Sequence, residues 1–267
     1  MDWYERDFDH PDYFEIYANK EKEAAEEGSA LATYLNLPPN SLVLDLPCGW
    51  GRLHPYWAMK GWKTVGGDLS SLNLDIHASK HPNELVRLDF RHLPFKSSVA
   101  DGVMCAFTSW GYFHEEEDNL RQLCEFARVL KPGGILLLDL AGRHYLENAI
   151  VLMEGYWYHV DDGDYMERVR WTRSKKRIIT DRIKNGHHFR HNIWIPTENE
   201  IKIALEKSGF HIDKCWGGLG GEKLMSSSER WIYRAICEKT TKPTPLSNVD
   251  SIVSFVYACL ILATHFL

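Results

Sequence analysis

The stretch Ser41-Leu-Val-Leu-Asp-Leu-Pro-Cys-Gly-Trp-Gly-Arg52 passes from an apolar run into a compact turn and then into a helical pattern. Leu42 to Leu46 is short and nearly all apolar, which is typical of a strand buried on both faces of a parallel sheet. Pro47 and the two glycines that follow it allow the backbone to come close to a ligand. The stretch therefore predicts a strand that ends at a cofactor-binding turn.

The overall composition is that of a chain able to bury a sizeable core. It has 267 residues, 44% of them hydrophobic and 25% charged, enough for one large domain or for a domain with an insertion. The 31 basic and 37 acidic residues give a formal charge of −6, which argues against nucleic acid as the default partner but leaves room for a local basic patch.

Cysteine usage and the N-terminal sequence indicate the compartment. The six cysteines are widely spread without a C-x-x-C pair, so neither a disulfide framework nor a zinc site is indicated, and a reducing compartment fits best. The first residues are acidic and aromatic rather than basic and then apolar, unlike a signal peptide. We therefore expect a cytoplasmic protein.

From Ser41 to about Ala141, strands alternate with helical patterns, which is the signal of a mostly parallel sheet with crossover helices. Ser70 or Ser71 can cap one helix, and Lys131-Pro-Gly-Gly134 stops another before an apolar strand. The expected strands cover residues 42–46, 62–68, 84–88, 100–107 and 135–140, and the expected helices cover 52–60, 70–80 and 115–130.

The pattern changes after Ala141, where four consecutive strands are joined by turns, and Asn185-Gly186 is a strong hairpin signal. Thr197 can cap a further helix that precedes two final strands. These elements are strands at 156–160, 165–173, 176–184 and 187–195, a helix at 197–207, and strands at 210–216 and 230–237. The predicted fold class is α/β: a doubly wound, Rossmann-like seven-stranded sheet with an antiparallel β insertion between strands five and six.

Five parts follow from this pattern. They are an N-terminal lid or helical segment (1–40), a cofactor-binding core (41–142), an antiparallel insertion that roofs the substrate (143–196), the end of the core (197–239), and a linker with an apolar tail (240–267). The aromatic-rich leader includes a charged helical run, Lys20 to Glu27, that ends near Gly28. It either folds over the site as a lid or packs on the flank of the domain, and both alternatives stay open.

The tail from Ile252 to Leu267 is apolar, but it is shorter than the ~20 residues that span a bilayer comfortably and has no flanking basic residues. It can form a docked terminal helix or touch a membrane, and a corrupted reading frame is a third interpretation. Membrane anchoring is not favoured.

Three aspartates follow the predicted strands at regular intervals. Asp68 comes 23 residues after Asp45, and Asp89 comes 21 residues after Asp68. In dinucleotide-type folds an acidic residue ~20 positions beyond the first turn takes the ribose hydroxyls of the ligand. The turn here is not G-x-G-x-x-G, which lowers the case for NAD or FAD.

Four motifs, in order and at matching spacing, resemble the class I S-adenosylmethionine-dependent methyltransferases. They are Val43-Leu-Asp-Leu-Pro-Cys-Gly-Trp-Gly-Arg52, Val65-Gly-Gly-Asp-Leu-Ser70, Leu88-Asp-Phe-Arg-His-Leu-Pro-Phe95 and Leu130-Lys-Pro-Gly-Gly134. The resemblance covers roughly residues 40 to 140, and the last two strands fit the same sheet. Pro47 stands where the commonest form of the first motif has glycine, and the Asp-Leu-Pro-Cys-Gly version resembles a bacterial branch of the family.

The resemblance implies S-adenosyl-L-methionine as cofactor and assigns positions around it. The first turn would lie against the methionine part of the cofactor, Asp68 would accept the ribose hydroxyls, Asp89 and Phe90 would hold the adenine, and the end of strand four would flank the sulfonium. The implied cofactor residues are Asp45, Pro47, Cys48, Gly49, Gly51, Arg52, Asp68, Leu69, Asp89, Phe90, Phe107 and Thr108.

Methyl transfer is a displacement at a methyl group on a positive sulfur, so the enzyme mainly aligns the acceptor and keeps water out. No metal is needed. A base helps only when the acceptor must lose a proton, and the candidates are His114, His144 and Tyr17. We expect the turn after strand four to face the acceptor, with Trp110, Tyr112 and Phe113 as contacts.

The insertion is the expected determinant of substrate. Between Tyr165 and His191 it holds nine Lys or Arg against two acids. Solvated strand faces are the favoured explanation, and the sharper hypothesis is that Arg168 and Arg170 recognise a carboxylate or phosphate on the acceptor. His187 and His191 share one strand face and His188 points to the other, without an acidic or cysteine partner at ligand spacing, so we expect no metal site.

The leading functional hypothesis is a small-molecule N- or O-methyltransferase, because a roof over the strand ends suits a small acceptor. An RNA or protein methyltransferase that grips its substrate with the basic insertion is the second hypothesis. The third is a protein that binds S-adenosylmethionine without transferring its methyl group.

Overall fold

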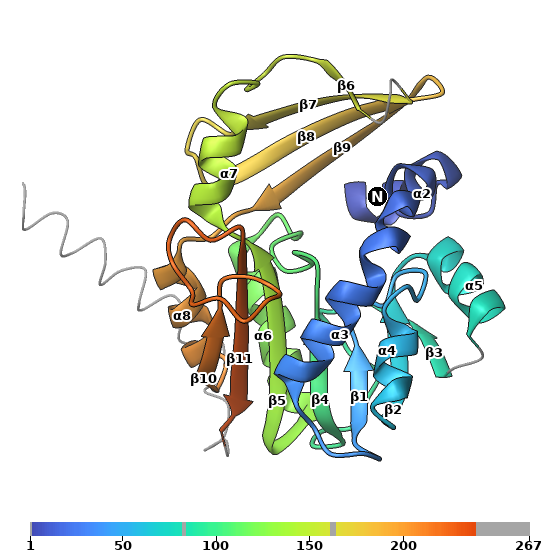
Figure 1. The fold of residues 1–267 in the computed structure, drawn as a ribbon, viewed down its shortest axis with the longest axis vertical. Coiled ribbons are helices and arrows are strands. Elements are labelled where there is room, and N and C mark those ends of the chain that lie inside the picture. Colours follow the sequence, from blue (N-terminus) through green and yellow to red (C-terminus); the bar gives the residue numbers. More distant parts are fainter. Residues whose placement is uncertain (1, 82–83, 161–163, 239–267) are drawn as a thin grey trace, which may run out of the picture.

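The computed structural model describes residues 2–81, 84–160 and 164–238 (Figure 1). The linker and apolar tail expected at 240–267 lie outside the described residues. Within the described part, no helix has both the length and the apolar character needed to cross a membrane.

A central sheet of seven strands has the order β10-β11-β5-β4-β1-β2-β3. The first five strands pair in parallel, and β11 runs antiparallel to both of its neighbours. The strands are β1 (Leu42–Asp45), β2 (Lys63–Asp68), β3 (Glu84–Arg87), β4 (Ala100–Cys105), β5 (Leu130–Ala141), β10 (Phe210–Trp216) and β11 (Arg230–Cys237). This order confirms the predicted Rossmann-like seven-stranded sheet.

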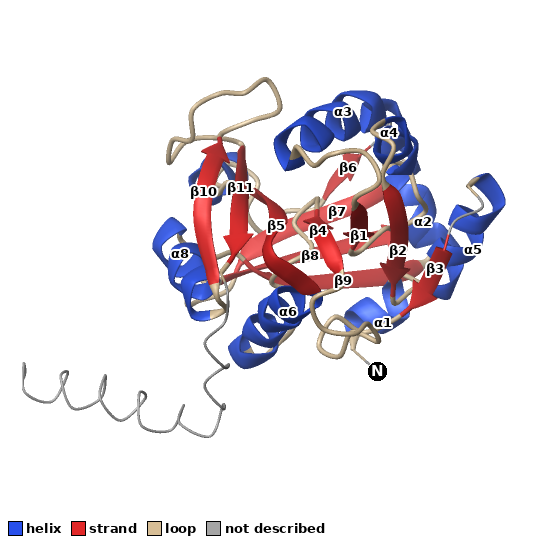
Figure 2. Ribbon diagram, turned by 90° about the horizontal axis from the view of Figure 1, so that it is seen from below, coloured by secondary structure: helices blue, strands red, loops and turns tan. Residues whose placement is uncertain are grey.

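Helices cover both faces of the sheet, with α3 (Ala24–Leu35) and α4 (His54–Met59) on one side and α6 (Glu116–Val129) and α8 (Glu198–Lys207) on the other (Figure 2). The neighbours Val43 and Leu44 of β1 belong to two different apolar clusters, one on each face. Both are fully buried, which confirms that β1 is covered on both sides.

Helix starts follow the capping residues. The Ser70 hydroxyl accepts the Asn73 N–H (3.1 Å) at the start of α5 (Ser71–Lys80), and Thr197 forms a capping box with Glu200 at the start of α8. Both starts agree with the sequence.

The boundaries that differ from the prediction include the end of strand four and the beginning of strand five. Strand four does not reach Phe107 but ends at Cys105, because Phe107 and Thr108 adopt positive φ angles of 59° and 54°. The Asp139 carboxylate and carbonyl accept their two N–H groups, at 2.8 and 2.9 Å, and hold the turn. The Lys-Pro-Gly-Gly segment is the beginning of β5 rather than a loop before it.

The prediction that the leader's helix ends near Gly28 is wrong. A 3₁₀ turn η1 (Ala18–Glu23) leads into α3, which continues through Gly28 to Leu35. A Cβ atom at Gly28 would lie 2.3 Å from Cδ2 of Tyr56. The glycine is therefore a close contact between α3 and α4, not a helix stop.

The insertion is a second, four-stranded antiparallel sheet, as predicted, and we call it the roof sheet. Its strands, in the order β6-β7-β8-β9, are β6 (Tyr158–Val160), β7 (Tyr165–Trp171), β8 (Arg177–Lys184) and β9 (His187–Trp194). A helix that the sequence did not indicate, α7 (Arg143–Ile150), leads into it. Figure 1 shows the roof sheet above the carboxyl ends of the parallel strands.

The N-terminal helices α1 (Trp3–Asp7) and α2 (Pro11–Tyr17) lie against the roof sheet. Tyr13 and Ile16 of α2 pack with Tyr165 and Phe189 of the roof sheet in one buried apolar cluster. These helices thereby connect the roof sheet to the core.

Candidate functional site

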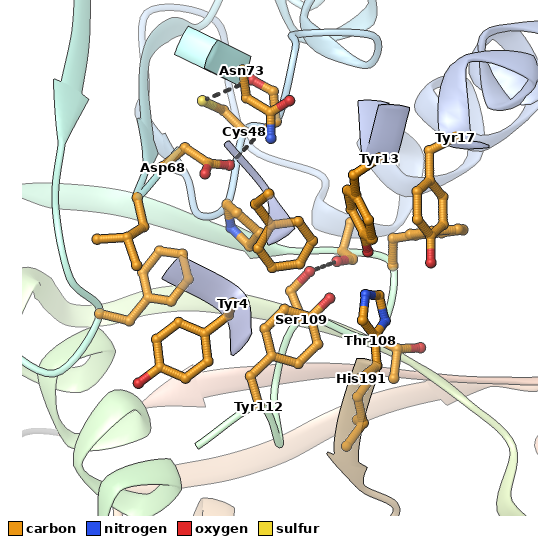
Figure 3. Close-up of a pocket in the computed structure, with 18 of the residues that line it drawn as sticks. Tyr4, Tyr13, Tyr17, Cys48, Asp68, Asn73, Thr108, Ser109, Tyr112 and His191 are labelled. Carbon is orange, nitrogen blue, oxygen red and sulfur yellow. Dashed lines mark hydrogen bonds between the residues drawn. The ribbon is translucent and has the colours of Figure 1, made fainter. Parts of the chain in front are cut away.

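A cavity of about 480 Å³ lies between the carboxyl ends of the core strands, the N-terminal helices and the roof sheet (Figure 3). Figure 3 shows Asp68 and Cys48 at one end of the cavity and Tyr17 and His191 at the other. The N-terminal segment contributes the aromatic side chains of Tyr4, Phe8, Tyr13, Phe14 and Tyr17, and the roof sheet contributes Ile178, Thr180, Arg182, His191 and Ile193.

The turn after β1 forms one wall of the cavity, to which Asp45, Pro47, Cys48, Gly49 and Arg52 all contribute. The Cys48 N–H donates to the Gly67 carbonyl (3.0 Å), which fixes the turn against β2. Gly51 is not part of the wall. Its φ is +79°, and a Cβ atom there would lie 2.4 Å from the His77 ring, so the turn requires glycine at this position.

Asp68 ends β2 with a buried carboxylate. Its Oδ2 accepts the Gly49 N–H and its Oδ1 accepts the Ser70 N–H, both at 2.9 Å. A carboxylate has about four lone-pair positions, so Asp68 can still accept from a ligand hydroxyl in the cavity. Burial raises the pKa of Asp68 to about 6 and that of neighbouring Asp45 to about 7.

Asp45 is less available to a ligand than Asp68. Its Oδ2 accepts the Trp57 indole N–H at 2.9 Å, and the side chain is buried. The residue therefore anchors α4 to the end of β1 as well as lining the cavity.

Leu69, Asp89 and Phe90 lie at the edge of the cavity beyond β2. The Asp89 carboxylate is held by Arg91, whose Nη2 donates at 2.6 Å and whose Nε lies 3.1 Å from both carboxylate oxygens. Burial favours a higher pKa for Asp89, but the hydrogen bonds from Arg91 outweigh it and keep that pKa below its usual value. Arg91, which was not predicted, therefore organises this edge.

Phe107 and Thr108 line the cavity at the end of β4. The Arg52 guanidinium carbon lies 5.2 Å from the centre of the Phe107 ring, and Tyr17 meets the same ring edge-on at 6.4 Å. The Thr108 hydroxyl accepts the Ala141 N–H (2.8 Å), which ties this turn to the end of β5.

A buried network of charges supports these two turns from behind. Glu27 of α3 pairs with Arg52 and, at 2.5 Å, with Arg230 of β11. Arg230 also pairs with Asp139 of β5 at 2.5 Å, and Asp139 holds the Phe107 N–H. Sequence reasoning missed Glu27, Asp139 and Arg230, because they lie on three separate elements and share no motif.

The predicted bases have different positions. Tyr17 lines the cavity, with its ring 5.1 Å from Tyr13. The assignment of His114 and His144 as candidate bases is corrected, because both side chains are exposed and neither lines the cavity. His144 lies on α7 and pairs with Glu147 (2.8 Å), and His114 falls just before α6, after the chain has turned away from the end of β4.

The expected acceptor contacts divide in a similar way. Tyr112 and Phe113 line the cavity, whereas Trp110 is completely buried elsewhere. The Trp110 indole donates to the Asn119 carbonyl (2.8 Å), and its ring packs on Trp194 at 5.1 Å. Its assignment as a substrate contact is corrected to a structural role.

Arg168 and Arg170 do not face the cavity, which corrects the hypothesis that they bind the acceptor. Arg168, Asp181 and Arg190 lie opposite one another on the neighbouring strands β7, β8 and β9. Both of these arginines and Arg170 pair with the fully buried Asp181. Side chains alternate between faces, so the next residue of β8, Arg182, lies on the cavity side instead.

Arg182 and His191 form the polar part of the roof over the cavity, and neither was predicted to contact a ligand. Arg182 Nε donates to Glu167 Oε2 (2.7 Å), and its Nη1 lies 3.3 Å from His191 Nδ1. The His191 ring is 97% buried and lies 4.5 Å from the Trp3 ring and 5.1 Å from the Tyr13 ring. Burial, together with the charge of Arg182, lowers the pKa of His191 well below its usual value.

This contact determines which nitrogen of His191 carries the proton. Arginine cannot accept a hydrogen bond, so Nδ1 of His191 must be the acceptor, and the proton of the neutral ring is on Nε2. Nε2 is buried and has no hydrogen-bond partner among the described residues. It is therefore a buried donor without a described partner, on a side chain that lines the cavity.

The core is similar to known proteins. Residues 44–138 match the family model described as a methyltransferase domain. The match covers the five parallel strands and the turn after β1, and it agrees with the class I methyltransferase resemblance of the sequence motifs. These residues are therefore similar to a methyltransferase domain.

Two curated relatives match the chain over part of their length. The putative methyltransferase YqeM of Bacillus subtilis is 32% identical over 109 residues, covering 39% of this chain and 44% of the relative. The dTDP-3-amino-3,4,6-trideoxy-alpha-D-glucopyranose N,N-dimethyltransferase of Streptomyces venezuelae is 30% identical over 139 residues. This match covers 49% of this chain and 56% of the relative. The chain thus spans about half the length of these relatives.

The fold extends further than the sequence match. An S-adenosylmethionine-dependent methyltransferase from Clostridium acetobutylicum superposes with a TM-score of 0.71 at 19% identity, covering 85% of this chain and 98% of that one. The shared architecture therefore includes much of the chain outside residues 44–138.

Proposed function

We propose that the chain, whose residues 44–138 match a methyltransferase-domain model, transfers the methyl group of S-adenosylmethionine to a nitrogen or oxygen of a small-molecule acceptor. One observation carries the proposal: a single cavity joins the turn after β1 and Asp68 to the inner face of the roof sheet. A cofactor on the core and an acceptor under the roof sheet would meet inside it.

The residues of the core suit S-adenosylmethionine. The Asp68 carboxylate lines the cavity and can accept from the ribose hydroxyls. Leu69 and Phe90 offer apolar contact for the adenine, and Phe107 and Tyr17 offer aromatic faces for the sulfonium. When bound, the cofactor supplies a methyl group on a positively charged sulfur.

The remaining walls suit a small acceptor. A volume of about 480 Å³ is within the usual range for small-molecule sites, and the aromatic side chains of α1 and α2 keep water away from it. The Streptomyces venezuelae relative is named for methylation of the amine of a nucleotide sugar, a small molecule. The arginines that could attract RNA lie on the other face of the roof sheet.

His191 orients the acceptor rather than removing its proton. A ring nitrogen that already carries hydrogen cannot act as a base, but it can donate to an oxygen or nitrogen lone pair of the acceptor. An acceptor with such an atom next to the methylated position fits this arrangement. The acceptor then loses its proton to water or, when the acceptor is an amine, loses it after the methyl transfer.

The function is tested with the purified chain, methyl-labelled S-adenosylmethionine and fractionated cell extract. We expect label in the small-molecule fraction that passes an ultrafiltration membrane, and none when the Asp68→Ala variant is used. Label confined to precipitated RNA or protein would support the second hypothesis instead. Cofactor binding without consumption in every fraction would contradict methyl transfer.

With the acceptor identified, His191→Phe should raise its KM about tenfold, the effect of losing one hydrogen bond of roughly 1.4 kcal/mol. The affinity for S-adenosylhomocysteine should stay within twofold. His191→Gln keeps an N–H donor and should recover part of the loss. If His191 were the base, both variants would lose kcat alike, and the low-pH limb of the kcat profile would disappear.

A further inference from the structure

Three metal-binding side chains gather where α2 meets the hairpin end of the roof sheet. His10, Asp12 and His187 each offer a ligand atom, and these atoms all lie within 4.8 Å of one another. His187 Nδ1 is 2.5 Å from Asp12 Oδ2, and His10 Nδ1 is 3.9 Å from the same oxygen. None of the three lines the cavity.

The local structure explains why they meet. His10 caps α2, with its Nδ1 accepting the Asp12 N–H at 3.2 Å, and Pro11 sets the first turn of the helix. The Asn185-Gly186 turn places His187 at the first position of β9, and the Asn185 amide donates to Asp12 Oδ1 at 2.9 Å. Phe189 packs on both Tyr13 and His10, at 5.5 and 5.2 Å between ring centres, and holds the two elements together.

We propose that His10, Asp12 and His187 bind a zinc-like divalent transition metal that fastens α2 to the roof sheet. Two imidazoles and one carboxylate are a common zinc ligand set, and they leave a fourth position for water. The side chains of His10 and His187 are 33% and 56% exposed, so an ion can reach them from solvent.

The arrangement needs only small movements to bind the ion. Ligand atoms about 2.0–2.2 Å from a tetrahedral zinc ion are about 3.3–3.6 Å apart. The His10 to Asp12 distance is close to that value, and the His187 to Asp12 distance must widen as the ion replaces the proton between them. His10 Nδ1 gives up its long hydrogen bond from the Asp12 N–H, and Asn185 continues to orient the carboxylate from its other oxygen.

The ion would act on the cavity from outside it. α2 supplies Tyr13, Phe14 and Tyr17 to the cavity wall, and β9 supplies His191. A metal bridge between these elements resists their separation and so keeps the cavity covered. The sequence does not predict the site, because Asp12 lies 175 residues from His187 and no motif connects them.

The proposal is tested by titrating zinc chloride into metal-free protein, by calorimetry and by thermal unfolding, without thiols or chelators. We expect one zinc ion per chain with micromolar or tighter affinity and a higher unfolding midpoint. His187→Gln and His10→Ala should each weaken binding at least tenfold and remove the midpoint shift.

His188→Gln is the matched control, because His188 is the next residue of β9 but points to the other face and contacts Asp181. It should bind zinc like the wild type. Equal zinc binding by His187→Gln and the wild type would mean an adventitious ion only. Absence of binding at 100 μM zinc in the wild type, or loss in His188→Gln as well, would also overturn the proposal.

Discussion

Replacing Asp68 with Ala should reduce the affinity for S-adenosylhomocysteine at least 100-fold, measured by calorimetry. The variant loses two hydrogen bonds from hydroxyls to a charged acceptor, each worth roughly 1.5–3 kcal/mol. It also releases the Gly49 and Ser70 N–H groups that the carboxylate holds. Asp68→Asn keeps one acceptor oxygen and should fall between the wild type and Asp68→Ala.

The pH dependence of this binding provides a second measurement. Burial raises the pKa of Asp68 to about 6, so below that pH the carboxyl is protonated in the free protein. A ligand that requires the carboxylate must then displace a proton. Affinity should therefore fall as the pH drops from 7 to 5, and the fall should be smaller in Asp68→Asn.

Asp101→Asn is the matched control for Asp68. Its carboxylate also accepts a backbone N–H, that of Leu42 at 2.8 Å, but at the opposite end of the parallel strands. The affinity of the Asp101→Asn variant for S-adenosylhomocysteine should equal that of the wild type. Unchanged affinity in Asp68→Ala would instead refute the assignment of the cofactor site.

Glu27→Gln should lower the free energy of unfolding by about 3–5 kcal/mol, measured by denaturant titration. Removing one partner from a buried ion network leaves the other charges uncompensated, which is the costly case for buried pairs. Here Arg52 and Arg230 would both lose their shared carboxylate. Since these arginines support the turns at 45–52 and 107–108, cofactor affinity should fall as well.

The loss of unfolding free energy in Glu27→Gln should depend on pH. Burial alone would raise the pKa of Glu27, but Arg52 and Arg230 outweigh it and lower that pKa below the usual value. A carboxyl group with a lowered pKa stabilises the fold above its unfolded pKa and loses that contribution as the pH falls through the folded value. The stabilities of wild type and Glu27→Gln should therefore converge in acid.

Glu23→Gln is the control for a surface pair. Glu23 pairs with Lys20 at 2.8 Å, and both side chains are substantially exposed. Exposed pairs contribute about 0–1 kcal/mol, so this change should have little effect. A Glu27→Gln variant as stable as Glu23→Gln would show that the buried network does not support the fold.

Local sequence was enough to predict the sheet, because the composition of its strands is typical of buried β-strands. Leu42 to Asp45 could only be stable with both faces covered, and Ser70 and Thr197 marked helix starts through their own hydrogen bonds. The helix α7 lacked such a signal, since Gly142 precedes it without a capping side chain. Gly28 was misinterpreted because the need for glycine comes from Tyr56, on another helix.

The site was predictable on the core side and not on the roof side. Asp45, Pro47, Cys48, Gly49 and Arg52 reach the cavity from the turn after β1, and Asp68 reaches it from the end of the neighbouring parallel strand β2. Arg182 and His191 reach it through the pairing of β8 with β9, which places them on the cavity side only once the register is known. Arg168 and Arg170 belong to the same group of basic residues in the insertion, but their side chains lie on the opposite face of the roof sheet.

The alternation of faces in β8 also limits how the roof sheet can change in length. Asp181, with its surrounding arginines, and Arg182, beside His191, are consecutive residues on opposite faces. A shift of one residue in this strand would exchange them and turn a buried carboxylate toward the cavity. A shift of two would keep each side chain on its own face. An insertion or deletion of one residue within β8 therefore exchanges the two faces beyond it, whereas a change of two residues preserves them.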